Sequence, residues 1–255
     1  QNFFLPEGFA VLLASLPGGH NRVNLLRREL GSNDPMRLLP VLIALQLNPV
    51  AELTDQVLLL ARSAEKRVAL EAARALLACG GSKVYLVILS LLKEAADPQR
   101  KAWLLPLAAS TGREEVWPVI VNYAASEDSG LAQAALHAAD TFPAPVEARS
   151  EVYRAAMRSE DPAVACLAAQ LAWHTGSMKA LRLLERHIGS ESRQHRAAAA
   201  AALGHVSAET AVPILAARFD SEKSGDVIRQ MILSLRQLLP QVRGNLRLHD
   251  VLLPW

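Results

Sequence analysis

Arginine and tryptophan, the residue types that most often anchor protein interfaces, recur in this chain with other polar residues at matching positions of a repeated pattern. The set consists of Arg74, His137, Asp140, Gln170, Trp173 and Arg236. Each lies six or nine positions after the start of one of several segments that recur at a nearly constant interval. We predict that they form a partner-binding face. The alternative is that Trp173 packs into the next repeat and the others are solvated.

Residues that carry catalysis do not occur in the necessary patterns. The sequence has no Gly-x-Ser-x-Gly, no Cys beside a His and no Gly-rich phosphate loop ending in Gly-Lys. Its seven histidines are scattered, and no two are four residues apart, the spacing that places two ligands on one helix face. We therefore predict no catalytic residue, no metal and no cofactor.

The elements that must position the six residues follow from the repeat. Seven segments start at Arg37, Val68, Arg100, Leu131, Val164, His195 and Val227. Four residues later come Val41, Ala72, Leu104, Ala135, Ala168, Ala199 and Met231. Eight residues later come Leu45, Leu76, Ala108, Ala139, Ala172, Leu203 and Leu235. All fourteen are apolar, and this spacing forms one stripe of a helix, so the pattern predicts a helical solenoid.

Each repeat is predicted to be a pair of helices joined by short turns. The first helices are expected near 21–30, 51–62, 83–94, 114–125, 145–158, 178–187 and 208–219. The second helices are expected near 35–47, 65–79, 98–110, 129–141, 162–174, 192–204 and 225–239. Asp-Pro pairs at 34–35, 97–98 and 161–162 are typical helix starts. Glycines at 31, 80, 81, 112, 176, 189 and 204 are expected in the left-handed conformation that often ends a helix.

The charge and the cysteine content exclude few classes of function. The formal net charge is +2, which gives no overall sign of nucleic-acid binding. Residues 179–255 hold 11 Lys and Arg against 7 Asp and Glu, either because Arg side chains coat helix surfaces or because an anionic partner binds there. Cys79 and Cys166 are expected to be small buried side chains, which leaves the compartment open.

The two ends differ from the array between them. Residues 1–19 are strongly apolar, and we interpret them as a cap over the first repeat or as the stub left after a removed signal or anchor. Residues 20–239 contain no linker or composition break, which favours one continuous array. Residues 240–255 form a tail that either seals the last repeat or serves as a docking peptide.

The repeats resemble the HEAT-repeat family, most closely its short bacterial type that also occurs in phycobilisome lyases. Asp161-Pro162-Ala163-Val164 and the run from His195-Arg196 to Leu203-Gly204 carry this resemblance, which covers about residues 20 to 238. His195-Arg196 stands where the family has Val-Arg, and the third, fourth and seventh repeats lack the Arg. The resemblance implies the architecture far more than the function.

Three enzyme classes with such repeats suggest alternatives. A HEAT-like hydroxylase binds two irons through His-Glu dipeptides, and this chain has none. A HEAT-like DNA glycosylase lines a basic cleft with Trp, Asp and Arg; here Trp103, Trp117 and Trp173 are available, with Arg74 and Asp140. A phycobilin lyase would bind a tetrapyrrole, and only the repeat itself favours that function.

We therefore predict an all-α, right-handed α-α superhelix (solenoid) of about seven HEAT-like helix pairs. Its predicted function is that of a non-catalytic scaffold or adaptor, which holds a protein partner on the concave face lined by the second helices. The alternative is a HEAT-like enzyme or nucleic-acid-binding protein with a Trp- and Arg-lined cleft. The cytoplasm is the favoured compartment; the Gln1 start and the apolar residues after it suggest, as the alternative, the soluble part of a membrane-associated assembly.

Overall fold

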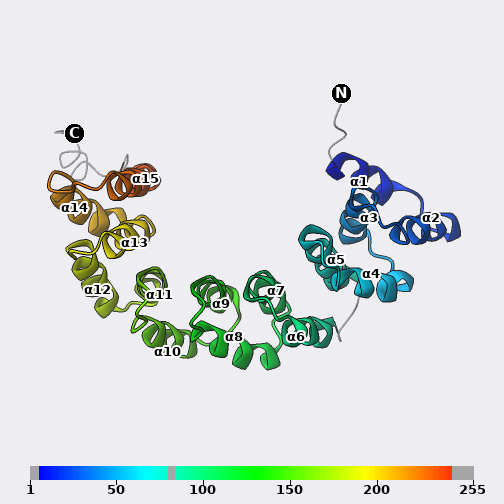
Figure 1. Ribbon diagram of the computed structural model, residues 1–255, viewed down its shortest axis with the longest axis horizontal. Helices are drawn as coiled ribbons and strands as arrows, with labels where there is room; N and C mark the ends of the chain where they lie inside the picture. Colours follow the sequence, from blue (N-terminus) through cyan, green and yellow to red (C-terminus); the bar gives the residue numbers. More distant parts are fainter. Residues whose placement is uncertain (1–5, 80–83, 243–255) are drawn as a thin grey trace. The chain divides into compact units, whose positions relative to one another are not determined.

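The chain is entirely helical in the part that its computed structural model describes, residues 6–79 and 84–242 (Figure 1). Those residues form fifteen α-helices and two short 3₁₀ helices, with no strand among them. The helices are α1 (Pro6–Ser15), α2 (His20–Leu30), α3 (Pro35–Leu47), η1 (Ala51–Leu53), α4 (Thr54–Ala61), α5 (Lys66–Cys79), α6 (Val84–Glu94), α7 (Pro98–Ser110), η3 (Glu114–Val116), α8 (Trp117–Ala124), α9 (Ser129–Thr141), α10 (Val146–Ala156), α11 (Pro162–His174), α12 (Met178–Ile188), α13 (Arg193–Leu203), α14 (Ala208–Phe219) and α15 (Gly225–Val242). The predicted all-α class is confirmed.

After α1 the helices form seven consecutive pairs, from α2 with α3 to α14 with α15. The bounds of α3, α7, α9, α11 and α14 agree with the sequence prediction at both ends. Two of the predicted first helices instead begin as the 3₁₀ turns η1 and η3 and are shorter than expected. Within the described residues, the helix pairs are therefore present in the number predicted.

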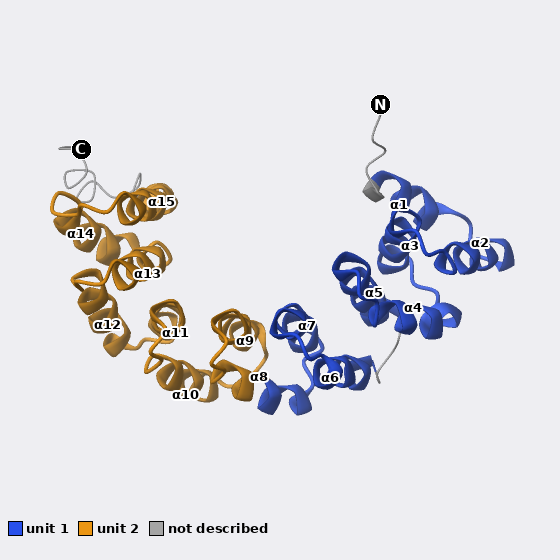
Figure 2. Ribbon diagram, in the orientation of Figure 1, with its two compact units in different colours: residues 1–119 blue, residues 120–255 orange. Residues whose placement is uncertain are grey.

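Two compact units make up the chain, Gln1–Val119 and Ile120–Trp255, and the division falls inside α8 (Figure 2). In unit 1 the second helices α3, α5 and α7 contact one another in sequence order. In unit 2 the second helices α9, α11, α13 and α15 do the same. Each unit thus stacks its repeats through the second helices. The path of the whole array as a right-handed superhelix stays a prediction.

The predicted apolar stripe of the second helices forms the core. Thirteen of its fourteen residues are buried, and Leu235 on α15 is partly exposed. Bonds between neighbouring repeats supplement this packing: the Ser234 hydroxyl donates to the carbonyl of Ala200 at 2.8 Å, and the Arg100 guanidinium donates to that of Ala61 at 2.7 Å. The register predicted from the sequence is therefore correct.

Helix starts follow the predicted chemistry. The carboxylates of Asp34, Asp97 and Asp161 each accept a hydrogen bond from a backbone N–H in the first turn of the helix that follows. These bonds satisfy donors that have no partner inside the helix. The Pro after each Asp needs no such partner, since it lacks an N–H.

The prediction for the helix-ending glycines is only partly right. Gly112 and Gly176 are left-handed, with φ of 63° and 87°. The prediction is wrong for Gly31, Gly189 and Gly204, whose φ values are −78°, −92° and −60°. At Gly204 the reason for glycine is space, because a Cβ there would lie 2.9 Å from the Cβ of Ser234. Gly80 and Gly81 lie outside the described residues.

The apolar start of the chain packs on the first repeat. Helix α1 contacts α3, and its Ala10 and Leu13 are buried, whereas the interpretation of residues 1–19 as a cap or an anchor stub stays a prediction. The buried guanidinium of Arg22 donates to the carbonyl of Asn48 at 2.7 Å, and the Asn48 amide donates to that of Ala14 at 2.9 Å. Within the described ranges, no helix is both long and apolar enough to cross a membrane. Of the predicted tail, residues 240–242 belong to α15, and residues 243–255 lie outside those ranges.

Candidate functional site

The six predicted partner-binding residues lie on second helices of both units. Arg74 belongs to α5 in unit 1, where its Nη1 lies 2.8 Å from Oε1 of Glu71. The side-chain amide of Gln46 donates to the same carboxylate at 2.8 Å. This cluster joins α3 to α5, so Arg74 takes part in holding two repeats together.

Asp140, on α9 in unit 2, also has a partner inside the fold. Its Oδ1 accepts a hydrogen bond of 3.2 Å from the hydroxyl of Tyr153 on α10, and Arg149 donates to its carbonyl. Tyr153 is fully buried, and burial is the main reason why its pKa lies far above the ordinary value. Asp140 therefore anchors a buried tyrosine as well as facing solvent.

The other four predicted residues have no such partners within the described part of the chain. His137 is exposed one turn before Asp140 on α9, and Gln170 and the partly exposed Trp173 lie one turn apart on α11. Arg236 is exposed on α15. Among the residues that the structure describes, none of these four side chains forms a hydrogen bond or ion pair. Helices α9 and α11 are in contact, so unit 2 brings His137, Gln170 and Trp173 to one pair of adjacent helices.

The tryptophans named for a base-binding cleft are divided between the units, with Trp103 and Trp117 in unit 1 and Trp173 in unit 2. The guanidinium of Arg100 lies 5.9 Å from the ring centre of Trp103. Arg100 also donates to the carbonyls of Ala61 and Ser63, one repeat earlier. Trp103 therefore stacks on an arginine that ties two repeats together.

One cluster of titratable side chains lies inside unit 2, and sequence spacing did not reveal it. The Sγ of Cys166 on α11 is 3.3 Å from Nδ1 of His187 on α12, and the rings of His187 and His195 are 4.7 Å apart. Cys166 is buried as predicted, and burial, followed by the nearby Asp161, raises the pKa of its thiol to about 12. Burial, then His195 and Arg186, lower the pKa of His187. At neutral pH the thiol is therefore protonated and can donate to Nδ1, whereas a nucleophile or metal ligand must be a thiolate. Over the described ranges, no three His, Cys, Asp or Glu side chains are placed to hold a metal ion.

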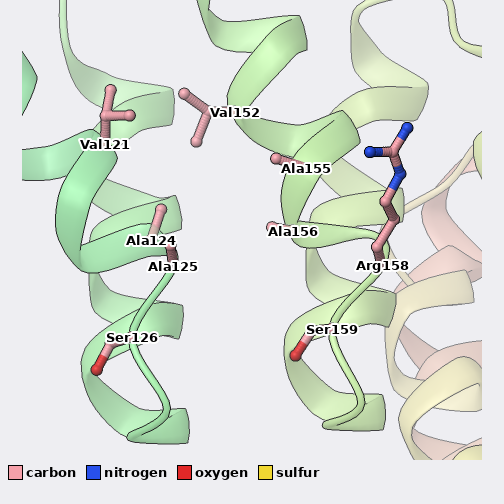
Figure 3. Close-up of a pocket in the computed structure, with 9 residues that line it drawn as sticks. All are labelled: Val121, Ala124, Ala125, Ser126, Val152, Ala155, Ala156, Arg158 and Ser159. Carbon is pink, nitrogen blue, oxygen red and sulfur yellow. The ribbon is translucent and has the colours of Figure 1, made fainter.

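The first helices of unit 2 are separated by grooves. The groove between α8 and α10 has a volume of about 310 Å³ and is mostly apolar, with Val121, Ala124 and Val152 among its lining residues (Figure 3). Its two serines, Ser126 and Ser159, each accept a backbone N–H two residues later, so their hydroxyls are already bonded. In Figure 3 the guanidinium of Arg158, in the turn after α10, lies on the side away from Val121.

The next groove, between α10 and α12, is basic. It has a volume of about 550 Å³, and five cationic side chains line it: Arg154, Arg158, Lys179, Arg182 and Arg186. The sequence shows an excess of Lys and Arg from residue 179 onward, but it does not predict this groove. Two of the five cations belong to the repeat before that segment, and only the stacking of α10 beside α12 brings them close to it.

Helix pairs that stack through their second helices define the class of protein, an α-solenoid. The particular repeat is identified over part of the chain, since residues 150–236 match the family model for HEAT repeats. This confirms the predicted resemblance for that segment.

Solved structures with some likeness include human deoxyhypusine hydroxylase in complex with glycerol, at 12% identity and a TM-score of 0.36, covering 90% of this chain and 88% of that one. An engineered protein has 19% identity and a TM-score of 0.35, with 91% and 73% covered. We infer nothing about function from likenesses at these TM-scores. No curated protein matches the chain.

Proposed function

We propose that this protein is a non-catalytic interaction scaffold that holds a protein partner along the second helices of unit 2. The observation that carries the proposal is the set of Trp173, Gln170 and His137 on the adjacent helices α11 and α9. These side chains reach the surface without an internal hydrogen bond or ion pair in the described structure. A partly exposed Trp offers a large rigid surface and one N–H donor, which is the usual make-up of an interface anchor.

Arg236 extends this surface on α15, while Arg74 and Asp140 have a smaller part in the proposal. Both are bonded inside the fold, to Glu71 and to Tyr153 respectively. Replacing either would change packing between helices together with any partner contact. A test of binding therefore needs residues without internal partners.

The experiment is affinity capture of the tagged protein from its native source, followed by crosslinking mass spectrometry and binding of the identified partner to purified variants. Trp173→Ala should weaken partner binding at least about tenfold, the scale of an interface hot spot. The matched control is Leu86→Ala, which removes an exposed apolar side chain from the first helix α6.

Helicity should be unchanged in both variants. Equal affinity of the Trp173→Ala variant and the native protein, or crosslinks confined to first helices, would contradict the second-helix surface. Recovery of a nucleic acid or small molecule with no stoichiometric protein would contradict the scaffold function itself.

A further inference from the structure

The basic groove between α10 and α12 holds an unusual excess of unpaired charge. Its five cations, Arg154, Arg158, Lys179, Arg182 and Arg186, are all exposed. Among the described residues none of them forms an ion pair or a side-chain hydrogen bond, whereas Arg62, Arg74, Arg193 and Arg196 elsewhere in the chain each pair with a carboxylate. No Asp or Glu is among the described residues that line the groove. Like charges gathered in one concavity raise the local positive potential and attract an anion.

The repeat does not require these cations for its own packing. Arg154 and Arg158 correspond, one repeat earlier, to Val121 and Ala125, which line the apolar groove between α8 and α10. Arg186 corresponds in the same way to Ala155, which lines that same apolar groove. Three of the five cations therefore occupy places that are apolar one repeat earlier. Packing alone does not explain the difference.

The positions of the cations suit an extended chain of carboxylates. Lys179, Arg182 and Arg186 lie on one face of α12, and the helical rise places them over about 10 Å. An extended peptide covers that length with about three or four residues, and its alternate side chains point the same way. Arg154 and Arg158 line the same groove from the α10 side. Four of the five cations are arginines, whose planar guanidinium matches a carboxylate in two parallel hydrogen bonds.

The remaining lining residues favour a peptide over a nucleic acid. Met157 and the buried Leu183 add apolar surface to the groove, which aliphatic side chains of a peptide can cover. No Trp, Tyr or Phe is among its described lining residues, although stacking on such rings is the usual way in which proteins hold unpaired bases.

We propose that the groove between α10 and α12 is a docking site for an extended acidic segment of a partner protein, with aliphatic residues interspersed among its Asp and Glu. This proposal rests on the scaffold function, because the ligand is a protein. The docking site, however, lies on the first helices of the repeats, whereas the surface proposed above lies on the second helices. A partner that contacts both sides would gain affinity from two linked sites.

The test is fluorescence anisotropy of a labelled peptide of about ten residues in which Glu and Leu alternate, at about 0.05 M and about 0.3 M salt, since screening weakens exposed charge pairs. The groove variant is Arg182→Glu with Arg186→Glu. The control variant is Arg67→Glu with Arg229→Glu, which changes the net charge equally at exposed cations on α5 and α15 that have no ion-pair partner in the described structure. Circular dichroism checks that both variants fold.

The native protein and the control variant should bind the acidic peptide with affinities within about twofold of each other, and the groove variant at least about tenfold more weakly, since charge-assisted hydrogen bonds are lost. The same peptide with Gln in place of Glu should not bind. An equal loss in both variants would reduce the effect to overall charge and overturn the proposal, as would an absence of binding by the native protein. Tighter binding of a single-stranded oligonucleotide or an anionic lipid vesicle through the same two arginines would also overturn it.

The variant Trp173→Ala separates this proposal from the second-helix surface. It should bind the acidic peptide as the native protein does, because Trp173 does not line the groove. If it binds the peptide normally and also keeps its partner, the second-helix surface is wrong and the groove stands. If peptide binding is absent while Trp173→Ala still loses the partner, the groove is wrong and the second-helix surface stands.

Discussion

Replacing Glu222 by Gln should destabilise the last two repeats of unit 2. Glu222 precedes α15, and its carboxylate binds Arg196 of α13 through Oε2 to Nε at 2.6 Å and through Oε1 to Nη2 at 2.9 Å. The same Oε1 accepts the backbone N–H of Ser224 at 2.8 Å, and Nη1 of Arg196 donates to the carbonyl of Ser190 at 2.9 Å. The Glu222 side chain is 4% exposed, so solvent screens this pair weakly.

The magnitude follows from the pKa of the carboxyl. The bonds to Arg196, and then those from the backbone N–H groups of Ser224 and Lys223, hold the pKa of Glu222 at about 2 instead of its ordinary 4.5. Because one pKa unit corresponds to about 1.4 kcal/mol, the ionised form contributes about 3 kcal/mol at pH 7. A folded pKa below the unfolded one means that this contribution is complete above pH 4.5 and is lost as the pH falls towards about 2. Gln at this position keeps one oxygen that can accept from Arg196 but presents its amide N–H to the guanidinium in place of the other, so we expect a loss of about 2 to 3 kcal/mol.

Urea unfolding followed by circular dichroism, at pH 7 and at about pH 3, measures the change in the free energy of unfolding. Amide hydrogen exchange in α13 and α15 localises it, since repeats can unfold separately. Glu191→Gln is the matched control, because the Glu191 side chain is exposed and has no ion-pair partner in the described structure. The difference between the two variants should shrink to less than about half by pH 3. Equal stability of the two variants at pH 7, or a difference that does not change with pH, would refute the reasoning.

Three further changes test the packing and the partly exposed His187. Leu203→Asp places an unpaired charge in a fully buried position and should lower the free energy of unfolding by several kcal/mol; an unchanged melting temperature would contradict the predicted register. Gly204→Ala should cost about 1 to 3 kcal/mol because its Cβ would meet Ser234, while Gly225→Ala, with no atom within 4 Å, should be neutral or slightly stabilising in the same melting assay. Because its folded pKa is lowered, His187 should favour folding above pH 6.5, its ordinary pKa, and this stabilisation should fall as the pH drops below that value. His187→Gln should flatten this part of the stability–pH curve measured by urea unfolding, and an unchanged slope would contradict the prediction.

The core could be predicted because it repeats. Positions such as Ala72, Leu104 and Ala135 are buried on each second helix, since every repeat buries the same stripe against its neighbours. Helix starts were equally predictable, since the Asp161 cap acts within three residues of the chain. Contacts that depend on the next repeat could not be predicted in this way. Gly204 has an ordinary helical φ, and only the approach of Ser234 from α15 explains its lack of a side chain.

The candidate site, too, has features that follow from the pattern within one repeat and features that depend on a neighbouring repeat. The sequence pattern places Trp173 and Gln170 opposite the buried stripe of α11, because helix periodicity determines which residues face away from the core, and both side chains are partly exposed. It could not show that Asp140 binds Tyr153, since that bond joins two helices of neighbouring repeats. It also could not show that Arg154 and Arg186, which belong to different repeats, line one groove.

A polar residue in a repeat protein can therefore be assigned a role by asking whether a neighbouring repeat already bonds it. Arg100 and Arg196 recur near the start of second helices, and each is bonded to carbonyl groups of the preceding turn or repeat, so the chemistry that they share serves stacking. Arg154 and Arg158 of the groove between α10 and α12 occur where the preceding repeat has Val121 and Ala125, and none of the five cations of the groove has a partner in the described structure. Packing between repeats does not explain a charged residue that replaces an apolar one of the preceding repeat and has no bonding partner inside the fold. Within unit 2 the groove between α10 and α12 has the most residues of this kind. Reversing the charges of Arg182 and Arg186 and measuring the binding of an acidic peptide is therefore the most direct test of what the scaffold binds.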